Sequence, residues 1–400
     1  MKFNKGIKSG LGACIIILLF SFDISAQVGG PEDPTTDGRT GSRIIRTGVP
    51  FLLIAPDSRS GAMGEAGVAI SPDASSIHWN PAKLAFIENT SGISLSYSPW
   101  LQKLVPDIDL AYLTGYYKLD DRNVLGASLR YFSLGEINLT DYSGNPISNY
   151  SPNEFAVDAA YSRQMGENFS LGTAFRFIYS NLLNGQFASG QQTKAGTALA
   201  ADVSAYFRKP TQLWGKDALI AAGVNISNIG NKIEYVEGDS NKVFLPTNLK
   251  LGVAATLYPD DFNEFTFTID INKLLVPSPP ITEVDEDNNF ETRIVKGRDP
   301  SKTSVPSGIF GSFADAPGGF KEEIQELSYS AGLEYRYNKQ FSLRAGYIYE
   351  APEKGNRNYL TVGAGLRYNL LNLDFSYLMA NQARSPLANT LRFSLLFSFQ

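Results

Sequence analysis

The feature that most constrains this chain is an alternation of apolar and polar side chains that recurs from about residue 92 to the C-terminus. It is clearest over residues 265–272, where Phe or Ile alternates with Thr, Asp or Asn. Successive side chains of a β-strand point to opposite faces, so each such segment predicts a strand with one apolar and one polar face. The segments number fourteen, approximately 92–98, 109–118, 123–133, 154–163, 168–180, 197–208, 217–226, 247–258, 265–272, 327–337, 341–347, 358–368, 371–380 and 390–399.

At least twelve charged residues well inside these segments lie on the polar parity, and the exceptions Arg163 and Lys273 stand at strand ends. A lysine or arginine that faces lipid at mid-membrane costs about 2–4 kcal/mol, so a membrane barrel keeps such residues in its lumen. A soluble β-sandwich also alternates, and parity alone leaves both folds open. Strand 109–118 is ambiguous, because its apolar residues occupy both parities. The sorted residues are Arg130, Asp158, Arg176, Asp202, Lys250, Asp270, Glu334, Arg336, Arg344, Arg367, Asp374 and Arg392.

The gaps between the segments favour the barrel. Gaps of eight residues or fewer alternate with longer ones, as periplasmic turns alternate with outer loops in membrane barrels. The short gaps are 119–122, 164–167, 209–216, 259–262, 338–339 and 369–370. We therefore predict an all-β fold over residues 91–400, a fourteen-stranded antiparallel transmembrane β-barrel of the outer membrane with both chain ends in the periplasm.

Residues 1–26 have the pattern of a secretory signal peptide. Three lysines precede an apolar stretch from Leu11 to Phe22, and Ala26 ends a small-residue cleavage sequence. Cys14 gives a superficial lipoprotein box, but the apolar stretch continues beyond it, which disfavours a lipid anchor. Cleavage after Ala26 leaves 32 basic and 39 acidic residues, a net charge of about −7 that gives nucleic acid no basic patch to bind.

Residues 27–90 do not alternate and are predicted to form a separate N-terminal segment. The first part of this segment is rich in Gly, Pro, Asp and Thr, a composition that is typical of chain without fixed structure. Small residues and an Asn-Pro turn follow, and these allow close backbone approach. We expect the segment to fold against or into the end of the barrel and to plug it, with direct ligand contact as the alternative. The motif residues are Gly61, Gly64, Gly67, Trp79, Asn80, Pro81 and Ala82.

The gap at 274–325 is the longest, at 52 residues. Loops of this length are usually functional or disordered. Asp285, Asp287 and Asn289 suggest a calcium loop, but Phe290 and Lys296 stand where its glycine and closing glutamate are required. Clustered exposed apolar residues often mark a surface that a partner covers. The loop is therefore the candidate docking site for a partner, through Ile309, Phe310, Phe313 and Phe320.

Composition excludes most enzyme chemistry. With one cysteine and one histidine, His78, the chain has neither a disulfide framework nor a cluster of histidine ligands. His78 is more simply a packed or solvated side chain than the base of a hydrolase. A P-loop and a dinucleotide fingerprint are also lacking. We expect no enzymatic activity and no catalytic, cofactor-binding or metal-binding residues.

Five motifs carry a resemblance to a known family: Arg46 to Leu52, Ala55 to Arg59, Gly64 to Ala69, Trp79 to Ala82, and Ser96 to Leu101. Together they resemble the PorV family, outer-membrane proteins of the Bacteroidota type IX secretion system. Asn-Pro-Ala alone indicates only the wider FadL-like barrel group. The likeness runs from the signal peptide to Phe399, and the resemblance implies a fourteen-stranded barrel.

The resemblance also implies a function. Proteins of this family bind cargo through its C-terminal secretion domain at a giant translocon barrel of the SprA or Sov type. They then deliver the cargo to a cell-surface attachment complex with a sortase-like peptidase, as in PorU-like proteins. The alternative is a FadL-type outer-membrane transporter of hydrophobic small molecules, with residues 27–90 as a movable plug. A polar lumen disfavours that alternative, because a transporter of this kind needs an apolar pocket.

Overall fold

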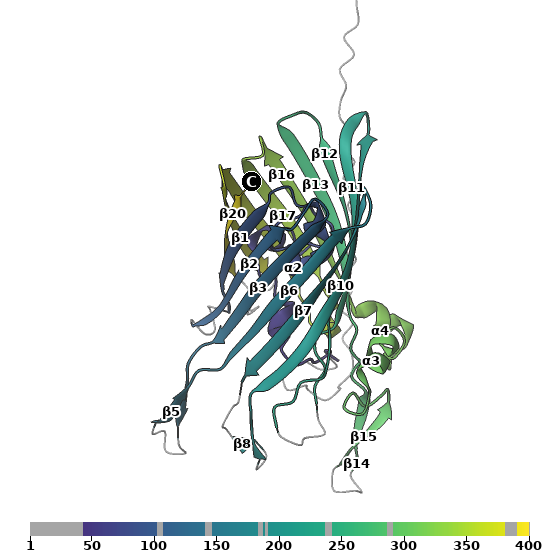
Figure 1. Cartoon of the computed structure of the whole chain (residues 1–400). Coiled ribbons are helices and arrows are strands. Elements are labelled where there is room, and N and C mark those ends of the chain that lie inside the picture. The colour runs from purple at the N-terminus through teal and green to yellow at the C-terminus, as the bar shows by residue number, and fades with distance from the viewer. Residues whose placement is uncertain are drawn as a thin grey trace, which may run out of the picture. The chain divides into compact units, whose positions relative to one another are not determined.

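The computed structural model describes residues 43–101, 107–140, 146–182, 187–188, 191–236, 242–285, 291–380 and 390–399. Within them, fourteen antiparallel strands form a closed barrel (Figure 1). The predicted fold is confirmed, and each predicted strand is present. The barrel strands are β1 (Ser91–Pro99), β2 (Ile108–Lys118), β3 (Asn123–Leu134), β6 (Asn153–Gln164), β7 (Phe169–Asn181), β10 (Gly196–Leu213), β11 (Lys216–Gly230), β12 (Asn248–Tyr258), β13 (Asn263–Leu274), β16 (Leu327–Tyr337), β17 (Phe341–Tyr349), β18 (Asn358–Tyr368), β19 (Leu371–Ala380) and β20 (Leu391–Phe399).

Each strand pairs with its neighbour in the chain, and β20 closes the barrel on β1, where Phe399 pairs with Ser91. Short and long connections alternate, so the barrel has a short-turn end and a long-loop end. The gap predicted at 209–216 is shorter in the structure. Strands β10 and β11 continue to pair as far as Leu213 and Lys216, which leaves two residues between them. Trp214 and Gly215 both have positive φ there, which makes a two-residue hairpin turn whose twist suits its strands.

The exterior of the barrel is apolar. Each barrel strand exposes at least one large apolar side chain, and hydrocarbon can cover a closed sheet of this kind because it has no unpaired edge. The exposed residues include Leu95, Leu113, Leu129, Val157, Phe175, Val203, Ile220, Val253, Phe267, Leu333, Leu343, Val362, Leu373 and Phe393.

The lumen holds the charged residues that the parity assigned to it. Of the twelve, Arg336 and Asp374 are half-buried, Arg367 is exposed near a strand end, and the other nine are buried. The ambiguous strand β2 points Leu110 and Tyr112 inward and Leu113 outward. Leu110 packs in the same cluster as Phe51, and Tyr112 lies beside His78 and Arg130, so the lumen is less uniformly polar than the sequence suggested.

Residues 43–87 lie inside the barrel, where most of them are buried (Figure 1). Asp57 begins α1 by accepting a hydrogen bond from the Ser60 N–H, a usual N-cap contact. Pro81 suits the first turn of η2, where its missing N–H costs nothing. The short helices are η1 (Pro50–Leu53), α1 (Ser58–Gly61), α2 (Ser76–Trp79) and η2 (Pro81–Phe86).

The loops at the long-loop end contain secondary structure of their own, which the alternation did not predict. The longest loop, residues 275–326, folds into a hairpin followed by two short helices. Ser304 caps the first of these helices through the Ser307 N–H. The additional elements are β4 (Ile137–Thr140), β5 (Pro146–Tyr150), β8 (Phe187–Ala188), β9 (Gln191–Gln192), β14 (Ile281–Asp285), β15 (Glu291–Lys296), α3 (Val305–Gly311), α4 (Phe320–Gln325) and η3 (Pro352–Lys354).

The two described ends of the chain lie at opposite ends of the barrel. Phe399 pairs with the first residue of β1 at the short-turn end. Arg43 donates a hydrogen bond to Glu322 of α4, in the longest loop. The predicted periplasmic position of both chain ends stays a prediction, and the predicted signal peptide lies outside the described residues.

Candidate functional site

The Asn-Pro-Ala motif is hydrogen-bonded to the barrel wall. The Asn80 amide donates to the carbonyls of Val68 and Ala205, both at 3.1 Å, and accepts from the Ala82 N–H. Asn80 thus joins two parts of the lumen segment to β10. Trp79 donates from its indole nitrogen to Asp57 at 2.6 Å, which ties α2 to the N-cap of α1.

Three serines from three strands hold Ala82. Its N–H donates to Ser204 Oγ of β10 at 3.0 Å. Its carbonyl accepts from Ser162 of β6 at 3.0 Å and from Ser170 of β7 at 2.7 Å. Buried backbone groups without partners cost free energy, so these serines satisfy groups that a short 3₁₀ helix leaves open.

Asp270 of β13 holds the lumen segment at another part of the wall. Its Oδ2 accepts hydrogen bonds from the backbone N–H groups of Gly67 and Val68 at 2.8 and 2.9 Å. Lys83 donates to the Gly67 carbonyl at 2.6 Å. Burial lowers the pKa of Lys83 to about 8, so this buried ammonium loses its proton far more readily than a solvated lysine.

Glycines bring the lumen segment into backbone contact with the wall. Gly64 has a φ of +67°, and a Cβ there would lie 2.5 Å from the Tyr347 carbonyl oxygen. A Cβ on Gly346 of β17 would lie 2.0 Å from the Gly64 nitrogen. Gly67 leaves room for the ring of Trp79, and Gly61 for the guanidinium of Arg392. At Gly64 and Gly346 the neighbouring atoms are backbone, so no larger residue fits where the lumen segment meets β17.

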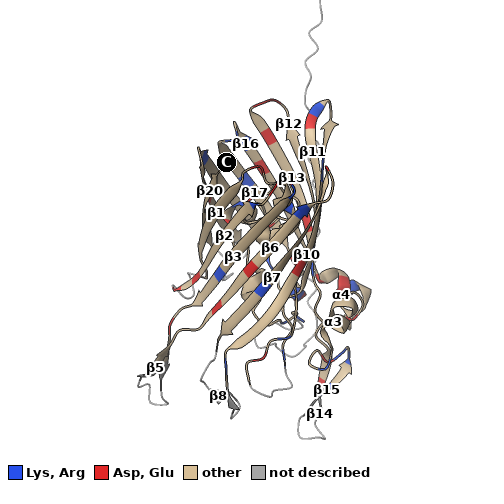
Figure 2. Ribbon diagram, viewed as in Figure 1, with Lys and Arg blue, Asp and Glu red and all other residues tan. Residues whose placement is uncertain are grey.

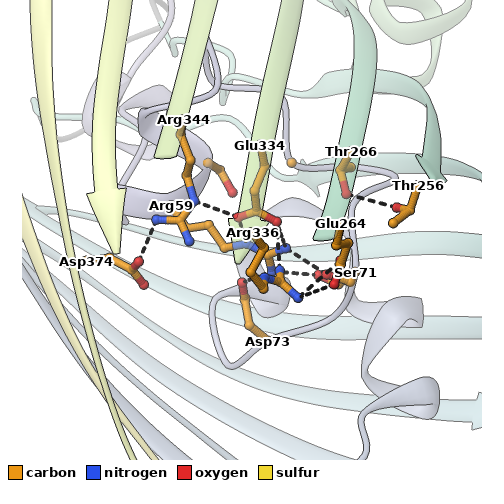
Figure 3. A network of polar contacts seen from close by, with 12 residues as sticks. Arg59, Ser71, Asp73, Thr256, Glu264, Thr266, Glu334, Arg336, Arg344 and Asp374 are labelled. Carbon is orange, nitrogen blue, oxygen red and sulfur yellow. Dashed lines mark hydrogen bonds and ion pairs between the residues drawn. The ribbon is translucent and has the colours of Figure 1, made fainter. Parts of the chain in front are cut away.

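A network of ion pairs joins the segment to β16 (Figure 3). Glu334 accepts from Arg59 at 3.0 and 3.2 Å, from Arg344 at 2.6 Å and from Arg336 at 2.7 Å. Arg59 also donates to Asp73 at 3.0 Å. The buried carboxylate of Glu334 thus lies among three guanidinium groups. Removing any one of these charged groups would leave another buried charge with fewer partners.

His78 is buried in the lumen between Arg130 of β3 and Trp79. Its Nδ1 accepts from the Arg130 guanidinium at 2.6 Å. Burial and the charge of Arg130 hold the pKa of His78 well below its ordinary value. The imidazole is therefore neutral, and it packs edge-on to Trp79 at 4.7 Å.

A second ion cluster, at the long-loop end, fixes α4 to the barrel. Figure 2 shows acidic and basic positions on α4. Lys273 at the end of β13 pairs with Glu326 at 2.9 Å, and Lys354 pairs with the same carboxylate at 2.9 Å. Lys354 also pairs with Glu322 at 2.6 Å, and Arg43 binds the same group. The cluster connects four chain segments, so α4 is fixed in position by charged contacts.

Helix α4, which that cluster holds, and helix α3 before it carry or adjoin exposed apolar side chains. Phe310 and Phe320 are each 80% exposed, Phe313 is exposed, and Ile309 is half-buried. We call these four residues the α3–α4 surface. The calcium-like pattern of this loop falls partly on 286–290, outside the described residues. Elsewhere in the described chain, no group of three or more His, Cys, Asp and Glu side chains could hold a metal ion.

A cavity of about 410 Å³ lies in the lumen toward the long-loop end. Residues 44–54 form one side of it, and β12, β13, β16, β17 and β18 contribute to the other. Trp79 is the one residue of the predicted N-terminal motif that lines it. The other motif residues contact the wall instead, at positions that sequence alone did not pair with particular strands.

Sequence reasoning missed the wall residues that receive the segment. The signal was present in glycines on the polar parity of their strands, because a glycine within a strand often marks a place where another backbone approaches closely. Where the segment touches the wall, such glycines are Gly172, Gly223, Gly252, Gly332, Gly346 and Gly363.

None of the helices in the described part of the chain has the length and apolar character needed to cross a membrane.

Several solved structures resemble the barrel. The Pseudomonas putida toluene transporter TodX shares 13% identity at a TM-score of 0.47, over 89% of this chain and 98% of that one. The CymD monoaromatic hydrocarbon channel shares 15% at 0.48, over 87% and 98%. The Ralstonia pickettii toluene transporter TbuX shares 13% at 0.45, over 86% and 98%. No curated protein matches the sequence significantly.

The family comparison covers more than half of the chain. Residues 37–281 match the family described as type IX secretion system protein PorV. The match includes the lumen segment from Arg43 onward and nine strands of the barrel, so it extends over the site described above. The chain therefore belongs to the PorV family, as an outer-membrane barrel of the type IX secretion system.

Proposed function

We propose that this barrel is a carrier subunit of type IX secretion. It binds cargo bearing a C-terminal secretion domain as the cargo leaves a giant translocon barrel, and it delivers that cargo to an attachment complex with a sortase-like peptidase. The long-loop end faces the cell surface in this proposal, as outer loops do in membrane barrels. The role is one of binding and transfer, with no catalytic step assigned to this chain.

The observation that carries the proposal is the α3–α4 surface. Two phenylalanines exposed to 80% on adjacent short helices are unfavourable in water unless a partner covers them. The ion cluster around Glu326 and Lys354 fixes α4 to the barrel. A fixed surface loses less conformational freedom on binding than a mobile loop, which favours docking to a large protein.

The occupied lumen supports the same proposal. Residues 43–87 contact several separate strands of the barrel, through Ser162 of β6, Ser170 of β7 and Asp270 of β13. We propose that this segment plugs the barrel, with Gly61, Gly64, Gly67 and the 79–82 motif as its contact points. A plugged barrel suits a protein that carries its cargo outside the lumen.

The test is affinity purification from native membranes with a double variant, Phe310→Ser with Phe320→Ser. Recovery of the translocon should fall at least tenfold, because the exposed rings would supply the apolar centre of the interface. Ile137→Ser is the matched control, since Ile137 is another exposed apolar residue at the long-loop end. Deletion of residues 300–320 should have the same effect and leave a folded, heat-modifiable barrel. Unchanged recovery of translocon and cargo with the double variant would refute the docking role of the α3–α4 surface.

Passage of hydrophobic small molecules is the second candidate, and the cavity is the observation that favours it. Part of its lining is apolar, including Ile45, Leu53 and Ile348. Passage beyond the cavity would require Asn80, Ala82 and their partners on the wall to separate. Copurification of a lipid or aromatic hydrocarbon in place of proteins would favour this candidate.

A further inference from the structure

The exposed side of the longest loop is basic, although the chain as a whole is acidic. Residues 293–325 carry five basic side chains, and all five are exposed: Arg293, Lys296, Arg298, Lys302 and Lys321. The four acidic side chains of the same residues are buried or half-buried, and each accepts a hydrogen bond from the protein: Asp299, Asp315, Glu322 and Glu323. The fold thus uses the negative charges of this loop in internal contacts and leaves the positive charges outside. This sorting suits contact with an anionic surface.

Helices α3 and α4 lie beside the wall, at its long-loop rim (Figure 1). Lys273, the last residue but one of β13, has the outward parity of the exposed Ile271. Its ammonium pairs with Glu323 of α4 at 3.1 Å. Lys232, just after β11, donates a hydrogen bond to the Pro300 carbonyl at 2.8 Å. Because the first of these contacts reaches the outward side of its strand, the loop stands next to the lipid that surrounds the barrel.

The exposed apolar side chains of the helices extend the apolar exterior of the barrel. The α3–α4 surface contributes its phenylalanine rings, and Ile324 of α4 is also exposed. On the wall, the outward apolar row of β13 runs from Phe267 through Ile269 to Ile271 and ends at Lys273, where α4 packs. A patch of rings and aliphatic groups flanked by basic residues, at the level of the strand ends, is typical of an element that lies in the headgroup layer of a membrane.

The basic side chains narrow the class of lipid. Arg298 lies beside α3, because a Cβ on Gly311 would be 3.4 Å from its guanidinium. Lys321 belongs to α4, and the side chain of Lys302 is 86% exposed and lies 3.6 Å from Asp299. Guanidinium and ammonium groups bind phosphate strongly, and clustered basic residues at a membrane surface favour anionic over zwitterionic lipid. Charge complementarity therefore selects lipids with a net negative headgroup.

We propose that the α3–α4 surface of the free barrel rests on anionic lipid in the leaflet at the long-loop end. The phenylalanine rings and Ile324 enter the boundary between headgroups and acyl chains, and Arg298, Lys302 and Lys321 bind the phosphates. The inference goes beyond the carrier function and does not depend on it, since lipid surrounds the barrel in any role. In a carrier that moves between two complexes, lipid covers the docking surface whenever neither complex does.

The experiment measures whether a fluorophore at this surface meets lipid or water. The barrel is reconstituted, one molecule per disc, in nanodiscs of phosphatidylcholine with or without phosphatidylglycerol. Phe313→Cys carries the environment-sensitive dye NBD, and the added cysteine stands alone because Cys14 lies in the predicted signal peptide. Nitroxide on the lipid headgroup should quench this dye at least threefold more than a dye at Ile137→Cys, another exposed apolar position at the long-loop end, because an interfacial element lies among the headgroups. Iodide in the water should quench the two dyes in the reverse order.

The role of charge is tested by neutralising the basic residues beside the helices, with Arg298→Gln, Lys302→Gln and Lys321→Gln combined. In the wild type at low salt, phosphatidylglycerol should raise headgroup quenching about threefold over phosphatidylcholine alone, because exposed basic groups are attracted to an anionic surface. The triple variant should lose this increase. The matched control should keep it, since it removes the same charge from exposed residues at the short-turn end, as Lys209→Gln, Lys216→Gln and Lys339→Gln. Heat-modifiable migration reports the folding of each variant.

Equal quenching of the two dye positions by lipid nitroxide would overturn the inference, because the α3–α4 surface would then stand in water. Protection from iodide without quenching by nitroxide would also overturn it, by showing that protein covers the rings in place of lipid. An increase with phosphatidylglycerol that survives in the triple variant would refute the role of the basic residues. The discs contain neither translocon nor cargo, so these results leave the carrier function to be tested separately by recovery of the translocon from native membranes.

Discussion

Arg59 and Glu334 lie 275 positions apart in the chain and form a two-point ion pair inside the barrel, with N···O distances of 3.0 and 3.2 Å. Arg59 belongs to α1 of the lumen segment and Glu334 to β16 of the wall. A bidentate pair fixes orientation as well as distance. Because Glu334 also binds Arg336 and Arg344, the contact joins the segment to a wall whose charges depend on it.

Glu334→Gln should loosen the lumen segment. The substitution removes the one carboxylate that three arginines share, and breaking a buried pair on one side costs about 3–5 kcal/mol. We expect a barrel that still assembles, loses its heat-modifiable form at a lower temperature, and conducts ions in planar bilayers more often than the wild type. Glu353→Gln, at an exposed position, should leave both measurements unchanged. Wild-type conductance in the Glu334 variant would show that the pair does not hold the segment.

Gly346→Ala should displace the segment by a different route. The added Cβ would lie 2.0 Å from the Gly64 nitrogen, and backbone on both sides prevents a small adjustment. The expected result is a loss of folded barrel in the outer membrane, measured by heat-modifiable migration. Gly166→Ala is the matched control, because a Cβ at Gly166 meets nothing within 4 Å. Equal assembly of the two variants would contradict the close backbone contact.

The sequence was sufficient to predict the barrel because the lipid outside the barrel and the lumen inside it accept very different side chains. Lipid excludes charge and the lumen accepts it, so inward residues such as Asp270 and Arg344 and outward residues such as Phe267 sort by parity. The same principle failed at β2, where Leu110 and Tyr112 face inward. Their environment is the lumen segment, and a strand's own sequence carries no sign of what fills the barrel beside it.

The site was less predictable for a related reason. The motif from Trp79 to Ala82 was identified, but its partners Ser162, Ser170 and Ser204 are ordinary polar-face residues in their own strands. Which wall residue lies beside which motif residue, more than 70 positions away in the chain, is determined only once the barrel has closed. The helices α3 and α4 were missed because each is shorter than two full turns of helix, too short for a 3.6-residue pattern to register.

Val253→Arg tests whether lipid covers the exterior. Val253 is exposed at the middle of β12, where an arginine facing lipid costs about 2–4 kcal/mol. Leu370→Arg places the same charge on an exposed residue at a short turn, where the cost falls to about 0–1 kcal/mol. Urea titration of the barrel folded in lipid vesicles should show a lower free energy of unfolding for Val253→Arg and an unchanged one for Leu370→Arg. Equal stability of the two variants would mean that depth does not matter and that the exterior does not meet hydrocarbon.

Acid should release α4 from the barrel through Glu322. Burial by itself raises the pKa of this carboxyl, but hydrogen bonds from Lys354 and the Gly318 N–H outweigh it, so the pKa lies below its ordinary value of 4.5. A carboxyl with a lowered pKa in the folded state stabilises that state above its unfolded pKa and loses the contribution as the pH falls through the folded value. Hydrogen exchange of residues 320–326, corrected for its intrinsic pH dependence, should therefore show protection at pH 7 that declines below about pH 4, near the ordinary pKa of glutamate. Glu322→Gln should have weak protection at both pH values, because an amide cannot pair with Lys354. Protection that is equal at pH 7 and pH 3 in the wild type would show that other contacts hold α4 in place.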